Sequence, residues 1–151
     1  MTEQPDPDFE LPASGGSPFR LSAQYGKKIV LYFYPKDSTP GCTTEAQQFR
    51  DLHAEFRAAG WEIFGISRDS MKSHQNFIAK QNLPFELLSD NAEKACALFE
   101  VIKMKTMYGK QVRGIERSTF VFDQMGVLRK EWRGVKVAGH AQEVLDFVRT
   151  L

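Results

Sequence analysis

The feature that most constrains the fold is a strand–turn–helix pattern in the first third of the chain. Residues 29–34 (Ile-Val-Leu-Tyr-Phe-Tyr) form an apolar run rich in β-branched and aromatic side chains, which is typical of a buried central strand. A short turn containing Pro35, Pro40 and Gly41 follows, and then apolar residues recur at helical spacing over 42–59. The apolar face of this expected helix consists of Cys42, Phe49, Leu52, Phe56 and Ala59. This pattern predicts a buried strand that leads through a tight turn directly into an amphipathic helix.

A cysteine stands where that helix is expected to begin. Thr39 suits the N-cap position, which would make Pro40 the first helical residue, where a missing N–H does no harm. Cys42 would then lie in the first turn, where free backbone amides and the helix dipole favour a thiolate over a thiol. Cys42 is therefore a candidate nucleophile, and the alternative at this stage is a buried structural cysteine.

The rest of the chain predicts an alternation of strands and helices. Further strands are expected at 62–67, 85–88, 118–122 and 127–132, and further helices at 71–82, 92–99 and 139–151. Ser70 and Asp90 are the expected caps of the helices that follow them. Residues 101–114, with several lysines, are expected to form a solvated loop. Near the N-terminus, Gly15-Gly16 within residues 5–21 predicts a small hairpin.

This order of elements predicts the fold class. Three βα units followed by two strands and a helix give a mixed sheet with helices on both faces and an antiparallel hairpin at one edge. A thioredoxin-like α/β sandwich fits that order best, and the 151 residues suit one domain spanning 1–151.

Composition excludes several classes of function. Twenty basic and nineteen acidic side chains give a net charge of +1 without blocks of like charge, so neither nucleic acid nor a membrane surface is expected as a partner. No apolar run has transmembrane length, and the first residues lack a signal peptide pattern, so a cytoplasmic location is expected. Two cysteines and three scattered histidines show no spacing typical of a metal site, and no cofactor motif is present.

The turn and the helix start resemble those of a known family. Pro35, Thr39 and Cys42 match the Pro-x-x-x-Thr/Ser-x-x-Cys signature of the peroxiredoxins. The longer run 33–45 resembles the bacterioferritin-comigratory, or peroxiredoxin Q, subfamily. Further matches at 65–67, 88–90 and 117–120 extend the resemblance over nearly the whole chain.

The resemblance implies a peroxidase with Cys42, Thr39, Arg117 and Pro35 as its catalytic residues. Cys42 would attack peroxide and become a sulfenic acid. Thr39 would place a hydroxyl beside the sulfur, and Pro35 would shape the turn and shield the sulfur from water. Arg117 begins an expected core strand, which is unusual for a permanent charge without a partner, and it would favour the thiolate and stabilise the departing oxygen. Glu45 would either orient an arginine or the turn, or remain a solvated first-turn acid.

The sequence departs from part of this family in how the sulfenic acid would be reduced. Many members have a second cysteine five residues after the first, where this chain has Gln47. Other members have it on the next helix, but the expected helix at 71–82 contains no cysteine. Cys96 lies in an apolar stripe and is expected to be a core residue. We therefore expect a one-cysteine cycle with thioredoxin, glutaredoxin or glutathione as external reductant. The resemblance also implies a monomer.

Three other interpretations remain open from the sequence. They are a two-cysteine cycle using Cys96, a non-catalytic peroxide sensor or holdase, and a thiol–disulfide oxidoreductase. The last lacks support because residues three positions before and after Cys42 are Thr39 and Glu45, so the Cys-x-x-Cys pair is missing.

Overall fold

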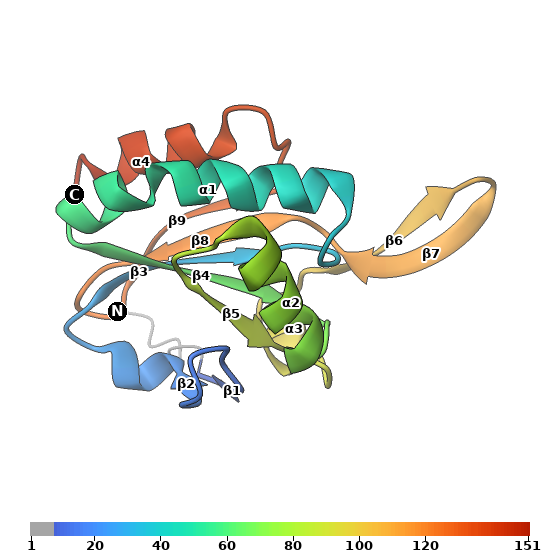
Figure 1. The fold of residues 1–151 in the computed structure, drawn as a ribbon, viewed down its shortest axis with the longest axis horizontal. Coiled ribbons are helices and arrows are strands. Elements are labelled where there is room, and N and C mark those ends of the chain that lie inside the picture. The colour runs from blue at the N-terminus through green and yellow to red at the C-terminus, as the bar shows by residue number, and fades with distance from the viewer. Residues whose placement is uncertain (1–7) are drawn as a thin grey trace, which may run out of the picture.

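A five-stranded mixed sheet forms the centre of the computed structural model, which describes residues 8–151 (Figure 1). Its strands, in spatial order, are β5 (Glu86–Ser89), β4 (Trp61–Ser67), β3 (Lys28–Phe33), β8 (Ser118–Phe122) and β9 (Leu128–Arg133). β3, β4 and β5 pair in parallel, whereas β8 is antiparallel to both β3 and β9. The mixed sheet with an antiparallel hairpin at one edge is therefore confirmed.

Four α-helices connect and cover the strands. They are α1 (Pro40–Ala58), α2 (Met71–Gln81), α3 (Lys94–Leu98) and α4 (His140–Val148). α1 and α4 lie side by side over one face of the sheet (Figure 1). Ser70 caps α2 as expected, because its side chain accepts a hydrogen bond from the amide of Ser73. None of the helices among residues 8–151 has the length and apolar character needed to cross a membrane.

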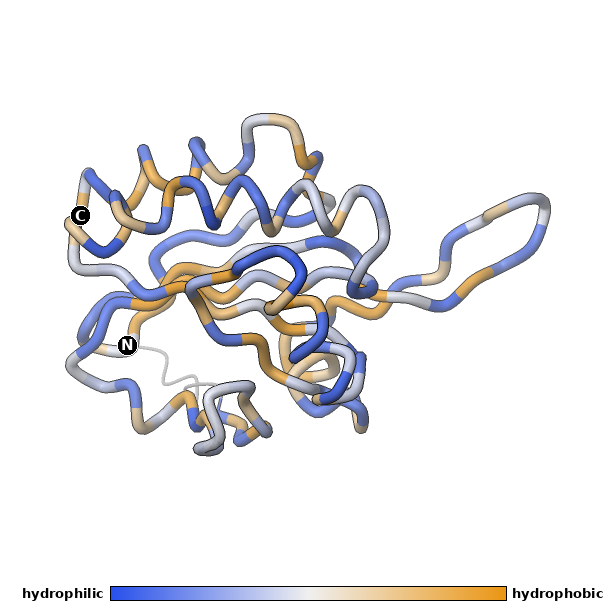
Figure 2. The backbone as a smooth tube through the Cα atoms, viewed as in Figure 1, coloured by the Kyte–Doolittle hydropathy of each residue, from blue (hydrophilic) through white to orange (hydrophobic). Residues whose placement is uncertain are grey.

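Two hydrophobic clusters fill the two sides of the sheet, and β3 contributes to both. Val30 and Tyr32 of β3 pack with α1, α2 and α4, whereas Leu31 and Phe33 pack with α3 and the N-terminal segment. Strands alternate their side chains between faces, and every residue from Ile29 to Phe33 is buried, as a central strand requires. Figure 2 shows that hydrophobic residues gather in the central strands.

A small hairpin covers the cluster that contains Leu31 and Phe33. β1 (Glu10–Leu11) and β2 (Phe19–Arg20) are antiparallel and are followed by a 3-10 turn over Leu21–Gln24. The expected N-terminal hairpin is confirmed, although residues 5–7 of the predicted range lie outside the described residues.

Residues 101–114, expected to be a solvated loop, instead form most of a second hairpin, so that prediction is wrong. β6 (Ile102–Met107) and β7 (Lys110–Ile115) are antiparallel and project from one end of the sheet (Figure 1). Apolar and polar residues alternate only over residues 102–105, and the lysines and Gln111 give the rest of the segment the polar composition of a solvated loop. The hairpin extends into solvent and buries neither face, so its sequence lacks the apolar side of an ordinary strand.

The helix expected at 92–99 is shorter in the structure. Glu93 has a φ of 58°, in the left-handed region, so the helix begins only at Lys94. Asp90 still serves this helix start, because its carboxylate accepts hydrogen bonds from the amides of Lys94 and Cys96 at 2.8 Å each.

Candidate active site

Cys42 lies in the first turn of α1, where the sequence predicted it. Thr39 is the N-cap residue, with extended backbone angles, and Pro40 follows at the first helical position. The Cys42 side chain belongs to the cluster beneath α1 and α4, and the residue is only 2% exposed.

Arg117 brings a positive charge to this sulfur. Its Nη2 donates to Cys42 Sγ at 3.5 Å. Phe33 pairs with Ser118 across the sheet, so Arg117 lies level with the start of the loop that leads to Cys42. Gly41 makes the approach possible, because a Cβ atom at this position would lie 3.2 Å from Arg117 Nη2. The structure thus brings together two residues that are 75 positions apart in sequence.

Glu45 holds the other side of this guanidinium. Arg117 Nη1 donates to Glu45 Oε1 at 2.6 Å, and the Glu45 side chain is fully buried, so the solvated alternative is wrong. Burial raises the pKa of Glu45 to about 7, although Arg117 acts in the opposite direction. Among the described residues, Glu45 Oε2 has no hydrogen-bond partner. For Arg117, burial lowers the pKa, but the negative charges of Glu45 and Cys42 outweigh it and raise the pKa overall.

Thr39 and Pro35 shape the loop before the helix. The Thr39 hydroxyl donates to the carbonyl of Lys36 at 2.7 Å, so it does not cap an amide of α1. With its hydrogen directed to Lys36, the hydroxyl oxygen can still accept hydrogen bonds. Pro35 is half-buried and directly follows Tyr34, whose amide extends the sheet by donating to Ile66 O at 3.0 Å.

A buried polar network beside the loop was missed by the sequence analysis. Asp37 Oδ1 accepts a hydrogen bond from the Tyr34 hydroxyl at 2.5 Å. Its Oδ2 accepts one from the Ser73 hydroxyl at 2.8 Å and lies 2.8 Å from His74 Nδ1. His74 Nε2 lies 2.9 Å from the carbonyl oxygen of Leu88. The network joins the loop to α2 and β5, and the only sequence signal for it was a charged residue within a Pro/Gly turn.

This network also contains side chains of the kinds that bind metal ions. Ligand atoms of Asp37, Asp69 and His74 all lie within 4.8 Å of one another, a grouping that their sequence spacing does not reveal. The same atoms bind within the protein: Asp69 Oδ2, for example, accepts from the Asp37 amide at 2.8 Å and from the Ser67 hydroxyl at 2.5 Å. The group thus fixes the conformation of the loop through its internal hydrogen bonds.

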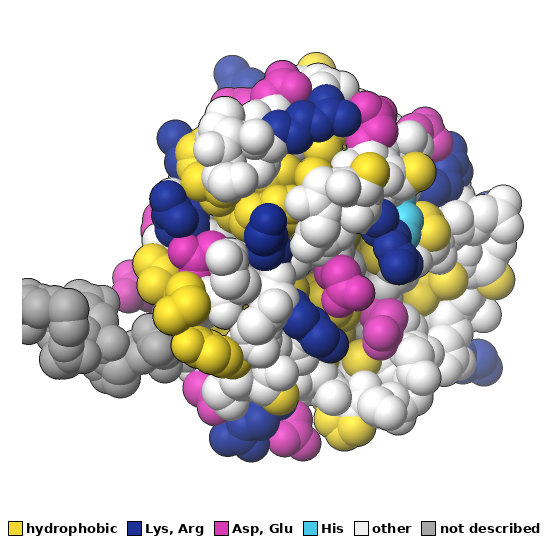
Figure 3. Space-filling model, turned by 90° about the vertical axis from the view of Figure 1, so that its left-hand side faces the viewer, with side chains coloured by type: hydrophobic (Ala, Val, Ile, Leu, Met, Phe, Trp, Pro, Cys, Tyr) yellow, Lys and Arg dark blue, Asp and Glu magenta, His cyan; other side chains and the backbone are white. Residues whose placement is uncertain are grey.

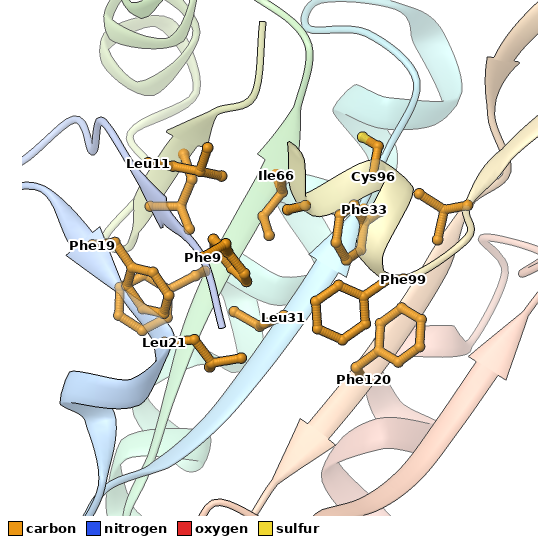
Figure 4. Packing of buried hydrophobic residues seen from close by; sticks show 14 of the residues in the cluster. Phe9, Leu11, Phe19, Leu21, Leu31, Phe33, Ile66, Cys96, Phe99 and Phe120 are labelled. Carbon is orange, nitrogen blue, oxygen red and sulfur yellow. The ribbon is translucent and has the colours of Figure 1, made fainter. Parts of the chain in front are cut away.

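Cys96, the second cysteine, lies on the opposite face of the sheet from Cys42. It is fully buried in the cluster that contains Phe33 and Phe99 (Figure 4). Burial raises its pKa well above the ordinary range of a thiol. The expectation of a core residue is confirmed, and such a thiol has little thiolate character at neutral pH.

The chain is similar over nearly its whole length to known proteins. The AhpC/TSA family model matches residues 2–131. Peroxiredoxin Bcp of Xanthomonas campestris is 57% identical over 147 residues, covering 96% of this chain and 92% of the relative. Peroxiredoxin Bcp of Bacillus subtilis is 50% identical and covers 98% and 94% of the two chains.

A solved structure shows the same fold. It is the Xanthomonas campestris bacterioferritin comigratory protein, studied for its alkyl peroxide reduction activity. It is 54% identical, has a TM-score of 0.89, and the match covers 94% of this chain and 90% of that chain. The expected thioredoxin-like α/β fold is therefore confirmed.

Proposed function

The chain belongs to the AhpC/TSA family, in the Bcp or peroxiredoxin Q group of peroxiredoxins, and from this we propose that it reduces hydrogen peroxide and organic hydroperoxides through Cys42. The observation that carries the assignment to Cys42 is its contact with Arg117, 3.5 Å from the sulfur, at the start of a helix. Organic hydroperoxides are included because the Xanthomonas campestris relative was studied for alkyl peroxide reduction.

The first step is attack of the Cys42 thiolate on one peroxide oxygen. A sulfur–oxygen bond forms, the oxygen–oxygen bond breaks, and the departing oxygen takes a proton to leave as water or an alcohol. Cys42 becomes a sulfenic acid. Negative charge moves from sulfur to the departing oxygen, so donors fixed around both atoms stabilise the transition state. Arg117 and the free amides of the first helical turn supply such donors.

The remaining residues hold this arrangement. The Thr39 oxygen can accept a hydrogen bond from the peroxide, while Pro35 limits the access of water from the loop side. Glu45 fixes the guanidinium of Arg117 by a charge-assisted hydrogen bond of 2.6 Å, and it therefore acts as a positioning residue.

The sulfenic acid is reduced by an external thiol in a one-cysteine cycle. A disulfide requires Cα atoms within about 7 Å of each other. Cys42 and Cys96 contribute to clusters on opposite faces of a five-stranded sheet, so an internal disulfide would require the sheet to open. Thioredoxin, glutaredoxin and glutathione are the candidate reductants.

We further propose that residues 1–151 act as one domain and as a monomer. Both clusters share β3, which supports a single domain. The edge strand β5 is covered by the N-terminal segment, through a bridge from Ala13 to Leu88 and a hydrogen bond from the Ser89 amide to Pro12 O. The other edge strand, β9, carries Arg129, Lys130 and Arg133, and charges on an edge strand oppose pairing with another chain.

The test is peroxide consumption with dithiothreitol as reductant. Wild type and Cys96→Ala should reduce many equivalents of peroxide per chain, whereas Cys42→Ser should reduce none. Activity retained in Cys42→Ser would contradict the assignment, and a single stoichiometric oxidation of wild type would favour a sensor or holdase.

Mass spectrometry after one equivalent of peroxide separates the two cycles. A sulfenic acid adds one oxygen to the chain, whereas an internal disulfide removes two hydrogens. An internal disulfide, together with lost turnover in Cys96→Ala, would establish the two-cysteine alternative.

A further inference from the structure

The hairpin formed by β6 and β7, residues 102–115, is a cationic arm. Its strands run antiparallel and meet at a turn where Tyr108 is 98% exposed. Lys103, Lys105, Lys110 and Arg113 are its charged residues, and it contains no aspartate or glutamate. The chain as a whole has a net charge of only +1, so the remainder of the molecule is net negative.

One face of the arm is both cationic and apolar. Cross-strand partners point to the same face, and the register pairs Lys105 with Val112 and Met107 with Lys110, with Lys103 on the same face. Met107 and Val112 are exposed on this face. None of the ion pairs found in residues 8–151 includes its three lysines, whereas Arg113 on the opposite face pairs with Glu93.

The surface at the other end of the molecule differs in character. There, basic and acidic side chains are interspersed (Figure 3). Many of the acids pair with arginines, as Asp8 and Glu10 do with Arg20, and Asp123 with Arg129. The arm, with four cations and no acidic residue, is therefore the better suited of the two surfaces to an acidic partner.

The arm stands beside the candidate active site. β7 ends at Ile115, two residues before Arg117, and the arm projects from the end of the sheet where α1 begins (Figure 1). A strand of this length extends about 20 Å. A small protein bound along the arm can therefore place a surface thiol at the start of α1.

We propose that the cationic arm is the docking surface for an acidic dithiol protein that reduces the Cys42 sulfenic acid, an inference that rests on the proposed function. Its lysines attract the acidic surface of the partner, and Met107, Val112 and Tyr108 supply apolar contact. Cys96 is inaccessible to Cys42, so the electrons come from a thiol that reaches this end of the molecule.

The reaction at the docked interface has two steps. A thiolate of the partner attacks the Cys42 sulfur, forms a mixed disulfide and displaces hydroxide, which takes a proton to become water. The second thiol of the partner then attacks its own sulfur in that disulfide. Cys42 returns as a thiolate, and the partner leaves with an internal disulfide, oxidised by two electrons.

The test compares a small reductant with protein reductants. Peroxide turnover is measured with dithiothreitol, and with thioredoxin or glutaredoxin of net negative charge, each kept reduced by its own recycling system. The arm variant carries Lys103→Glu, Lys105→Glu and Lys110→Glu. The control variant carries Lys27→Glu, Lys72→Glu and Lys80→Glu, which changes three exposed lysines elsewhere by the same total charge.

In the arm variant, kcat/KM for the protein reductant should fall at least about tenfold, because charges on one surface change association rates by such factors. Turnover with dithiothreitol should stay within about twofold, which also shows that the variant is folded. The control variant should resemble wild type with both reductants. Wild-type turnover with the protein reductant should also fall as salt is raised from about 0.02 to 0.3 M.

Other outcomes would overturn the inference. One is a kcat/KM for the protein reductant that falls equally in the arm and control variants, or that does not fall in the arm variant. Another is that wild type shows no turnover with either protein reductant. A third is a wild-type dimer, seen by light scattering, that the arm variant abolishes. A wild type inactive even with dithiothreitol would instead refute the proposed function itself.

Discussion

Replacing Glu45 by glutamine tests the electrostatics of the candidate site most directly. Glu45 is fully buried, contacts Arg117 through one oxygen and has no partner for the other among the described residues. Glutamine has nearly the same shape and can still accept a hydrogen bond from Arg117, but it cannot titrate. The variant therefore removes the proton equilibrium and keeps most of the packing.

The expected effect follows from the pKa of Glu45. Burial raises it from 4.5 to about 7, so between these pH values the folded protein binds more protons than the unfolded chain. The stabilisation is fully present below pH 4.5 and is lost as pH rises through 7. A shift of this size corresponds to about 3 kcal/mol.

The assay is urea unfolding of wild type and Glu45→Gln at a series of pH values from 4 to 8. The free energy of unfolding of wild type minus that of the variant should decrease by about 3 kcal/mol from pH 4 to pH 8. Glu62→Gln is the control, because Glu62 is exposed on β4 and the substitution makes the same chemical change outside the candidate site.

A difference between wild type and Glu45→Gln that does not change with pH would refute this reasoning. It would mean that the carboxylate is stabilised by Arg117 as fully as it is by water. A difference that grows with pH would reverse the sign and place Glu45 among ordinary ion-paired acids.

Two further predictions concern Arg117 and His140. Arg117→Met should lower the second-order rate constant for oxidation by peroxide by about 100-fold or more, because it removes a charged donor to the sulfur and the departing oxygen. Stopped-flow tryptophan fluorescence measures this rate, and a change below threefold would remove Arg117 from the proposed mechanism. Burial lowers the pKa of His140 from 6.5 to about 4, so the folded protein loses about 3 kcal/mol of stability as pH falls through this range. In His140→Gln this loss should disappear from urea unfolding curves, and an unchanged pH dependence would contradict it.

Much of the fold followed from local patterns in the sequence. Residues 29–34 predicted the central strand because a strand buried on both faces is continuously apolar. The 42–59 helix, the Ser70 cap and the Gly15-Gly16 hairpin each have their own local signal. The β6–β7 hairpin did not, because a ribbon in solvent has no apolar face to reveal it.

The candidate site was only partly predictable. The position of Cys42 came from the turn and helix start, and Arg117 was suspected because a charge at the beginning of a core strand needs a partner. The burial of Glu45 and the hydrogen bonds of Asp37 with His74 could not be predicted, since they depend on how α1 and α2 pack on the sheet. Sequence spacing does not contain that information.

In the proposed cycle, the separation of Cys42 and Cys96 by the central sheet affects how long an oxidised Cys42 would persist. In the one-cysteine cycle proposed above, no neighbouring sulfur shortens the lifetime of the sulfenic acid, so the supply of reductant sets it. When peroxide arrives faster than reductant, the same sulfur can react again and advance irreversibly to sulfinic acid. Cys96, shielded among aromatic rings, would remain a thiol throughout, so cysteine damage from excess oxidant should concentrate on Cys42.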